Sequence, residues 1–148
     1  MSNQIIKNKK AFHNYEVLDR FEAGISLVGT EVKSLREGSV KIMEAFCRIS
    51  KDYELTLNQL EISHFKQGNI NNHEVTRVRK LLMHKREIFR LSQKMQEKGL
   101  SLIPTAMYFK RGRVKVEIAL CRGKKMHDKR ASLKEKDQKR EIARALKG

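Results

Sequence analysis

The stretch LIPTAMYFKRGRVKVEIALC, residues 102–121, decides the fold class, because it reads as a pair of strands, in the second of which apolar residues alternate with others. Alternation of this kind is the period of a strand with one buried face. The predicted strands cover residues 102–109 and 113–121 and pair with each other. The apolar residues that share one face of the second strand are Val114, Val116, Ile118 and Leu120. Pro104 lacks a backbone N–H, so we expect it at a strand start or on a sheet edge.

Earlier parts of the chain carry the same period. In residues 15–27 the apolar side chains fall mostly at every second position, and Gly24 and Gly29 permit a bend or bulge that lets a sheet curl. Two shorter strands are predicted at residues 45–51 and 54–62. Only two residues separate them, which fits a tight hairpin.

Two segments carry helical signals. Thr30 is placed to cap a short helix that has Glu31 in its first turn and stops at Gly38. From near Val75, apolar residues recur at helical spacing, which predicts a long helix ending at residues 98–99. The residues on its apolar face are Val78, Leu81, Leu82, Ile88, Phe89 and Met95. This periodicity by itself favours a core position for Leu82.

These elements together predict the architecture. Several curved strands and one substantial helix, without a repeating strand-helix-strand rhythm, favour a closed sheet over a doubly wound one. We expect a mainly β protein, an OB-fold-like antiparallel barrel with embedded α-helices. A length of 148 residues suits one such domain.

Charge indicates the kind of partner. The chain has 33 Lys and Arg against 17 Asp and Glu, a net charge of +16, which favours an anionic partner and above all nucleic acid. A membrane is not expected, because no apolar span, lipidation signal or anchor helix is visible. We therefore expect a cytoplasmic protein. Cys47 and Cys121 lack C-x-x-C spacing and are predicted to be reduced thiols on strands.

The two ends differ from the body in composition. Residues 1–10 carry Lys7, Lys9 and Lys10 without an apolar period, which predicts a mobile or RNA-clamped arm before a barrel at 11–122. Residues 123–148 form a basic tail too poor in apolar side chains to offset its ordering cost, so we expect it to be disordered when free. It still carries helix signals, with Ser132 and Glu135 at capping-box spacing and a small apolar stripe of Ile142 and Leu146. Helix formation is therefore expected on docking.

Enzymatic signatures are missing. No glycine-rich phosphate loop, nucleophile elbow, metal-binding histidine pair or paired-carboxylate motif occurs. A metal-dependent nuclease would need converging carboxylates, and Glu31, Glu44 and Asp52 form no recognisable set. We expect no catalysis, no metal and no cofactor.

Several residues are candidates for RNA contact. The segment GKKMHDKR, from Gly123 to Arg130, combines cations for phosphates with His127 for stacking on a base, although solvated surface charge explains it equally well. Asn8, Lys9 and Lys10 have Phe12 beside them, for which a core position is favoured. Glu22 can accept hydrogen bonds from base amino groups or form a surface salt bridge. Packing is the favoured role for three further aromatic residues, namely Phe65, Tyr108 and Phe109.

Three separate segments resemble one protein family. They are NKKAFHNYEVLDRFEAGISLVGTEVKSLREG at 8–38, TRVRKLLMHKREI at 76–88 and GKKMHDKR at 123–130. In the same order, and over essentially the whole chain, they resemble the signatures of the SsrA-binding protein family. The resemblance implies an OB-fold barrel that grips the tRNA-like part of transfer-messenger RNA near its elbow and delivers this RNA to stalled ribosomes. It also implies a C-terminal tail that enters the vacant mRNA channel of the ribosome and becomes helical there.

The resemblance also assigns residues and partners. The implied RNA surface consists of Asn8, Lys9, Lys10, Glu22 and Leu82. The implied contact with small-subunit rRNA at the decoding centre consists of Gly123, Lys124, Lys125, His127, Asp128, Lys129 and Arg130, with His127 stacking. Elongation factor Tu and alanyl-tRNA synthetase are implied partners through the charged RNA, and a monomer is expected. Ile142 and Leu146 would lie in the implied tail helix. The tail end ARALKG, residues 143–148, follows the family less faithfully. The rival interpretation is a ribosomal or RNA-chaperone protein with a basic extension.

Overall fold

The fold is built around one curled antiparallel sheet, seen in the computed structural model, which describes residues 2–66, 72–97 and 99–124. Seven strands are ordered β1-β8-β9-β2-β7-β5-β4. They are β1 (Ser2–Lys7), β2 (Tyr15–Ile25), β4 (Phe46–Ile49), β5 (Leu55–Asn58), β7 (Arg79–Leu82), β8 (Leu100–Lys110) and β9 (Arg113–Gly123). A small second sheet pairs β3 (Val40–Lys41) with β6 (Glu61–Ile62). The predicted fold class, mainly antiparallel β with helices, is confirmed.

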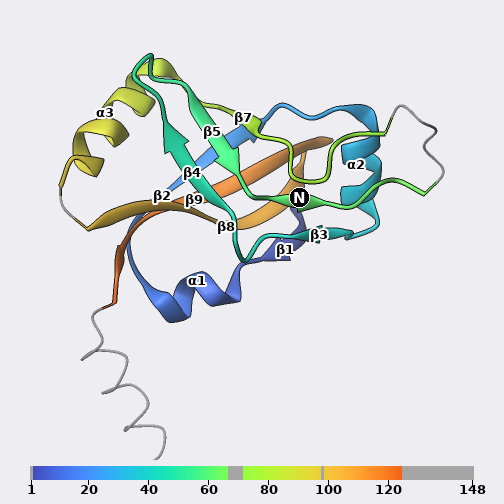
Figure 1. The fold of residues 1–148 in the computed structure, drawn as a ribbon, viewed down its shortest axis with the longest axis horizontal. Coiled ribbons are helices and arrows are strands. Elements are labelled where there is room, and N and C mark those ends of the chain that lie inside the picture. The colour runs from blue at the N-terminus through green and yellow to red at the C-terminus, as the bar shows by residue number, and fades with distance from the viewer. Residues whose placement is uncertain (1, 67–71, 98, 125–148) are drawn as a thin grey trace, which may run out of the picture.

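Three helices surround this sheet. They are α1 (Lys9–Asn14), α2 (Gly29–Arg36) and α3 (Lys85–Met95). Figure 1 shows α3 and α2 at opposite ends of the sheet and α1 below it. The last strand of the sheet, β4, lies back against β8, so the sheet curls around one core. None of the helices in the described parts of the chain is long and apolar enough to cross a membrane.

The strand pair predicted from residues 102–121 is present as β8 and β9, which together with β2 are the longest strands of the sheet. β8 and β9 are joined by a turn in which Arg111 and Gly112 have φ of 53° and 75°, the left-handed pair that two-residue hairpins require. The predicted alternation of β9 holds as far as Ile118, with Val114, Val116 and Ile118 buried, but the second half of the strand is buried on both faces, because Ala119 and Cys121 are also fully buried. Pro104 does not start its strand. It lies within β8 at a register shift, where a missing N–H is tolerated.

The remaining apolar positions close the core from the other strands. β2 contributes Ala23 and Ile25, and the hairpin of β4 and β5 forms where the spacing predicts it. The predicted strand 54–62 is interrupted at Gln59, whose φ is 61°, so that its end becomes β6. Cys47 on β4 and Cys121 on β9 are free thiols on strands, as predicted, and both are buried, which raises the pKa of Cys121 to about 11.

The N-terminal residues are not an arm. Ser2–Lys7 form β1, which pairs with the second half of β8 at the sheet edge. The expectation of a mobile segment is wrong for these residues, because the sheet edge supplies hydrogen bonds that the sequence alone does not reveal. Phe12 is also not a core residue. It lies half-buried on α1, with Lys7 Nζ and the Arg20 guanidinium each 5.4 Å from its ring centroid.

The helix predicted from Val75 begins ten residues later. Arg79–Leu82 form the strand β7, in which Arg79 and Leu81 are buried and Leu82 is 52% exposed. The core position expected for Leu82 from the helical period is therefore wrong. The C-terminal part of the prediction, α3 with its end before Gly99 at φ 87°, is correct.

A buried ion network fixes α2 against β7. Glu31 and Arg79 are both fully buried and bonded to each other, and Arg77 donates to the second Glu31 oxygen at 2.6 Å. Burial alone would raise the pKa of Glu31, but hydrogen bonds from Arg77, the Val28 backbone and Arg79 outweigh it and lower the pKa. The helix N-cap is thus Val28 rather than the predicted Thr30, and Gly38, at φ 72°, ends the helix as predicted.

Candidate nucleic-acid interface

The outer surface of the sheet carries a row of side chains that crosses five strands. Cross-strand register places Gln4 of β1 opposite Tyr108 of β8, then Lys115 of β9, Gly24 of β2 and Leu82 of β7. Residues in such register project from the same side of a sheet. The row therefore presents an amide, a phenol, an ammonium group and an apolar side chain on one surface.

A second row of the same surface carries its carboxylates. Glu22 of β2 lies opposite Glu117 of β9. Each of them has a partner, because Arg20 approaches Glu117 at 3.3 Å and Lys110 approaches Glu22 at 3.3 Å. Two like charges facing each other across strands are thereby compensated. We call this surface the open face and define it by Gln4, Arg20, Glu22, Leu82, Tyr108, Lys110, Lys115 and Glu117.

Glu22 occupies the centre of the open face and is held as a carboxylate. The hydroxyl of Tyr108 donates to one of its oxygens, and this bond, with Lys110 and Lys115 nearby, lowers the pKa of Glu22. Two shallow grooves meet at Glu22. One includes Leu82 and Lys115, and the other includes Tyr108 and Lys110. An ionised carboxylate between two grooves can accept hydrogen bonds from base N–H groups, and the flanking cations can bind phosphates.

Gly24 allows Leu82 to stand beside it on the open face. A Cβ atom at Gly24 would lie 3.3 Å from the Leu82 Cβ, closer than most contacts between side chains. Because Leu82 is more than half exposed, it contributes little to the core and is available to an incoming ligand.

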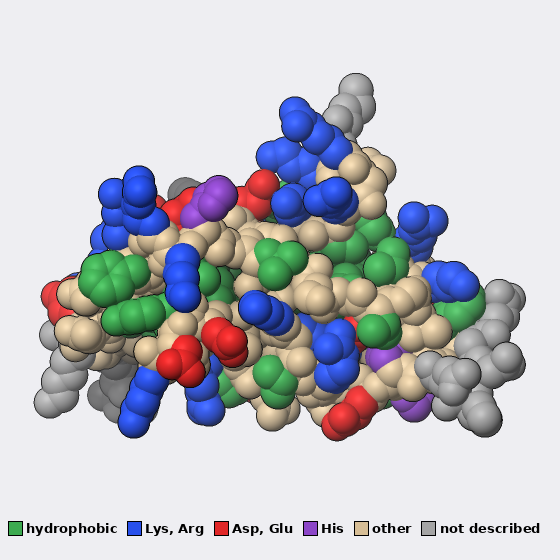
Figure 2. Space-filling model, turned by 90° about the horizontal axis from the view of Figure 1, so that it is seen from above, with side chains coloured by type: hydrophobic (Ala, Val, Ile, Leu, Met, Phe, Trp, Pro, Cys, Tyr) green, Lys and Arg blue, Asp and Glu red, His purple; other side chains and the backbone are tan. Residues whose placement is uncertain are grey.

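Cations extend this surface. Lys7 and Arg20 flank the Phe12 ring beside the open face, and among the ion pairs of the described residues none involves Lys7 or Lys115. Figure 2, which looks at the molecule from another side, shows Lys and Arg side chains spread over the visible surface with only small patches of Asp and Glu. Positive charge therefore predominates on this side of the molecule and, with the net charge of +16, would attract a polyanion.

The first three residues of the implied RNA surface lie elsewhere. Asn8 is 1% exposed and caps α1, with its amide accepting from the Ala11 N–H and donating to the Pro104 carbonyl at 3.0 Å. Its polar atoms are thus engaged inside the protein. Lys10 pairs with Glu44 at 2.7 Å, and Lys9 is exposed.

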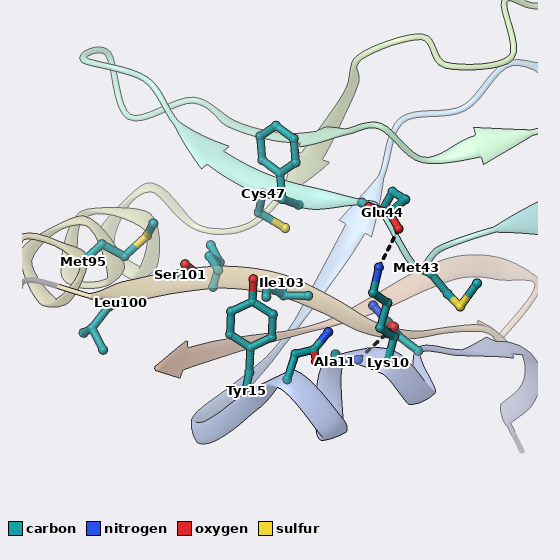
Figure 3. A pocket seen from close by; sticks show the side chains of 15 residues that line it. Lys10, Ala11, Tyr15, Met43, Glu44, Cys47, Met95, Leu100, Ser101 and Ile103 are labelled. Atoms are coloured by element: carbon teal, nitrogen blue, oxygen red, sulfur yellow. Dashed lines mark hydrogen bonds and ion pairs between the residues drawn. The ribbon is translucent and has the colours of Figure 1, made fainter. Parts of the chain in front are cut away.

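Lys10 borders a separate groove between α1, β4 and β8. Figure 3 shows Lys10 and Glu44 joined at one end of this groove and Tyr15 rising from its α1 side. The groove has a volume of about 490 Å³, and its lining includes Asn8 but neither Glu22 nor Leu82. The structure therefore brings Glu22 and Leu82 together and places Asn8, Lys9 and Lys10 on a different part of the surface.

The root of the tail leaves beside α1. Gly123 is the last residue of β9 and pairs with Tyr15, and the Lys124 N–H donates to the Asn14 carbonyl at 3.0 Å. The other implied decoding-centre residues, Lys125 and those from His127 to Arg130, lie outside the described residues, as do Ile142 and Leu146. Among the described residues, no group of three His, Cys, Asp or Glu side chains is arranged to hold a metal ion.

Sequence reasoning missed several residues of the open face. Tyr108 was assigned to packing, whereas it is half-buried and bonded to Glu22. Lys110, Lys115 and Arg20 were not singled out. The signal that could have identified them is strand period, because charged or polar residues two apart on one strand, such as Arg20 and Glu22 or Tyr108 and Lys110, project from the same face of the sheet.

Comparisons with known proteins agree on one family. A family model described as SmpB protein matches residues 5–148. An SsrA-binding protein of Syntrophotalea carbinolica is 54% identical over 143 residues, covering 97% of this chain and 95% of the relative. One from Carboxydothermus hydrogenoformans is 50% identical over 147 residues, covering 99% of this chain and 98% of the relative.

A solved structure is similar in both fold and sequence. It is described as "tmRNA-SmpB: a journey to the center of the bacterial ribosome". The match has a TM-score of 0.70 at 44% identity and covers 86% of this chain and 93% of that chain. Fold, sequence and site geometry can therefore be interpreted together.

Proposed function

This chain belongs to the SmpB family of SsrA-binding proteins, and from that premise we propose that it binds transfer-messenger RNA and acts in trans-translation on stalled ribosomes. The observation that carries the proposal is the open face, a preformed sheet surface with an ionised Glu22, an exposed Leu82 and several cations. Phosphate contacts from cations position an RNA, and polar and apolar contacts to unpaired bases add selectivity.

The open face and the tail would then have separate roles. We assign Glu22 and Leu82, together with Tyr108 and Lys115, to the tRNA-like part of the RNA. Since the Asn8 amide is engaged internally, its role in this scheme is to fix the start of α1, which carries Lys9 and Lys10. The residues from Gly123 to Arg130, with the helix that includes Ile142 and Leu146, would occupy the decoding centre and the vacant mRNA channel.

The separate roles of the open face and the tail explain how the protein would distinguish a stalled ribosome from a translating one. A channel that still holds mRNA cannot admit a cationic segment, whereas a vacant channel lined by phosphate attracts it. Elongation factor Tu and alanyl-tRNA synthetase would join through the charged RNA rather than through this chain. The protein would work in the cytoplasm with ribosomes, as a binding factor that leaves its RNA intact.

Replacing Leu82 by alanine should weaken binding to the tRNA-like domain about tenfold, or 1.4 kcal/mol, because it removes apolar contact on the open face. Stability should change little, since the side chain is half exposed. Val78→Ala is the matched control, because Val78 is 55% exposed but lines none of the grooves of the open face. Filter binding or fluorescence anisotropy measures the RNA affinity of both variants. Equal losses for Leu82→Ala and Val78→Ala would show that Leu82 does not contact RNA.

Salt dependence tests the phosphate contacts. If Lys115 neutralises one phosphate, Lys115→Gln should reduce the slope of log K against log salt by about 1. Lys51→Gln serves as control, because Lys51 is exposed in the turn between β4 and β5. The slopes come from binding titrations at several salt concentrations. A slope that is the same for Lys115→Gln and the unchanged chain would remove Lys115 from the phosphate-binding set.

Sedimentation separates this function from that of a structural ribosomal protein. A rescue factor should be scarce and should follow stalled ribosomes in a gradient. A structural protein would be present in every ribosome at equal stoichiometry, and finding the chain in that proportion would contradict the proposal.

A further inference from the structure

A second cleft lies at the end of the barrel, away from the centre of the open face. It is formed by β1, the last turn of α2 and the turn between β8 and β9, and has a volume of about 520 Å³. This volume is in the range of sites that hold small ligands. Its lining includes Asn3, Gln4, Leu35, Arg36, Phe109 and Arg111.

The cleft is cationic without compensation. None of its lining residues is acidic, and among the ion pairs of the described chain none involves Arg36 or Arg111. The Arg36 guanidinium carbon lies 5.8 Å from the Phe109 ring centroid, which holds this charge over the aromatic floor. Arg111 also lines the cleft, from the hairpin turn between β8 and β9. Two exposed guanidinium groups around one hollow are suited to phosphate oxygens.

The floor and rim fit the rest of a nucleotide. Phe109 is half-buried and packs against the core, so it can offer the exposed part of its aromatic ring to a base. Asn3 and Gln4 are exposed amides that can donate to and accept from a base edge. Gly112 lines the cleft with no atom of another residue within 4 Å of where its Cβ would be, which leaves room for a sugar-phosphate backbone.

We propose that this cleft binds one unpaired nucleotide of the RNA, with the base at Phe109 and the phosphates at Arg36 and Arg111. The proposal rests on the proposed RNA-binding function and extends it to a second site. Gln4 lines both this cleft and a groove of the open face, so an RNA strand can pass from one to the other around β1. Because β1 is an edge strand, no further strand of the sheet blocks that path.

The test compares two double variants of the full chain that remove equal charge. Arg36→Gln with Arg111→Gln empties the cleft of cations. Arg48→Gln with Arg90→Gln is the control, since both residues are exposed and Arg48 lies over Phe46 at 5.8 Å, just as Arg36 lies over Phe109. We expect at least a tenfold loss of affinity for the tRNA-like domain in the first variant and less than threefold in the second. Thermal unfolding should show that both remain folded.

Probing of the RNA by 2′-hydroxyl acylation supplies the second measurement. At saturating protein, the unchanged chain and the control should protect one unpaired nucleotide that the first variant leaves reactive. Equal affinities of the two variants, or the same protection pattern in both, would overturn the cleft proposal while leaving the open face untouched, and would point to another ligand such as an acidic peptide. A failure of the unchanged chain to bind this RNA would instead reject the proposed function and the cleft with it.

Discussion

Truncation after Lys124 should abolish tagging of stalled products, by at least a hundredfold, while affinity for transfer-messenger RNA falls by less than about fivefold. The reason is that every residue of the open face precedes this point, and β9 is complete at Gly123. The removed residues 125–148 contain nine Lys or Arg and four Asp or Glu, a net charge of 9 − 4 = +5. Loss of this charge weakens nonspecific attraction to any RNA, and moderate salt reduces that contribution.

Two assays and one counterpart variant make the truncation decisive. RNA affinity is measured by anisotropy at about 0.2 M salt, where nonspecific attraction is screened. Tagging is measured in reconstituted translation of a message without a stop codon. Leu82→Ala should give the opposite pattern, with weaker RNA binding and tagging that recovers at high protein concentration. If the truncated chain lost RNA binding and tagging to the same degree, the assignment of separate roles would be wrong.

Replacing Arg79 by methionine should destabilise the fold by about 3–5 kcal/mol, a large share of the stability of a small domain. Arg79 is fully buried, and besides Glu31 it donates to the carbonyls of Leu60 at 2.6 Å and Val75 at 3.0 Å. Methionine fills a similar volume but leaves these acceptors and part of the Glu31 carboxylate without partners. The loss reflects uncompensated polar groups more than the energy of the ion pair itself.

Urea unfolding followed by circular dichroism measures this change. Arg48→Met is the control, because Arg48 is exposed on β4, and it should change the free energy of unfolding by less than about 0.5 kcal/mol. The double variant Arg79→Met with Glu31→Gln should be destabilised by less than the sum of the two single variants. The reason is that Glu31→Gln removes the buried charge that Arg79→Met leaves unpaired. A loss below 1 kcal/mol for Arg79→Met would show that the network is not what fixes α2 against β7.

The central strands were predictable because their pattern is local. Alternation in residues 113–118 indicates which side chains are buried, and the short connection at Arg111 and Gly112 fixes the pairing. Burial of Ala119 and Cys121 on the other face was not predictable in this way, because it depends on packing of the assembled fold. The segment SNQIIK has only two apolar residues. It becomes a strand because it pairs with residues 106–110 of β8 at the edge of the sheet, which is a property of the assembled sheet.

Residues 75–89 show why the helix boundary was wrong. The neighbours Leu81 and Leu82 satisfy a helical period together with Ile88, so a strand followed by a helix has the same apolar spacing as one long helix. The deciding feature is Arg79, a charged residue that points into the core. Its burial depends on Glu31, 48 residues earlier, and no local pattern could indicate that pairing.

The site was predictable only in part for a related reason. Glu22 and Leu82 were identified by resemblance, and the structure brings them together in the lining of one groove. Tyr108 and Lys115 are 86 and 93 residues away from Glu22 in sequence and reach it only through strand register. Asn8 is the opposite case. It was assigned to the RNA surface by resemblance, but its place in the family signature does not reveal that its amide is buried.

Nuclear magnetic resonance of the full chain, labelled with ¹⁵N and titrated with the tRNA-like domain, tests the central claim most directly. The account predicts that the largest amide shift changes fall on β2, β7, β8 and β9 around Glu22, Leu82, Lys110 and Lys115. Changes confined to other surfaces, with these amides unmoved at saturation, would contradict the assignment of the open face to transfer-messenger RNA.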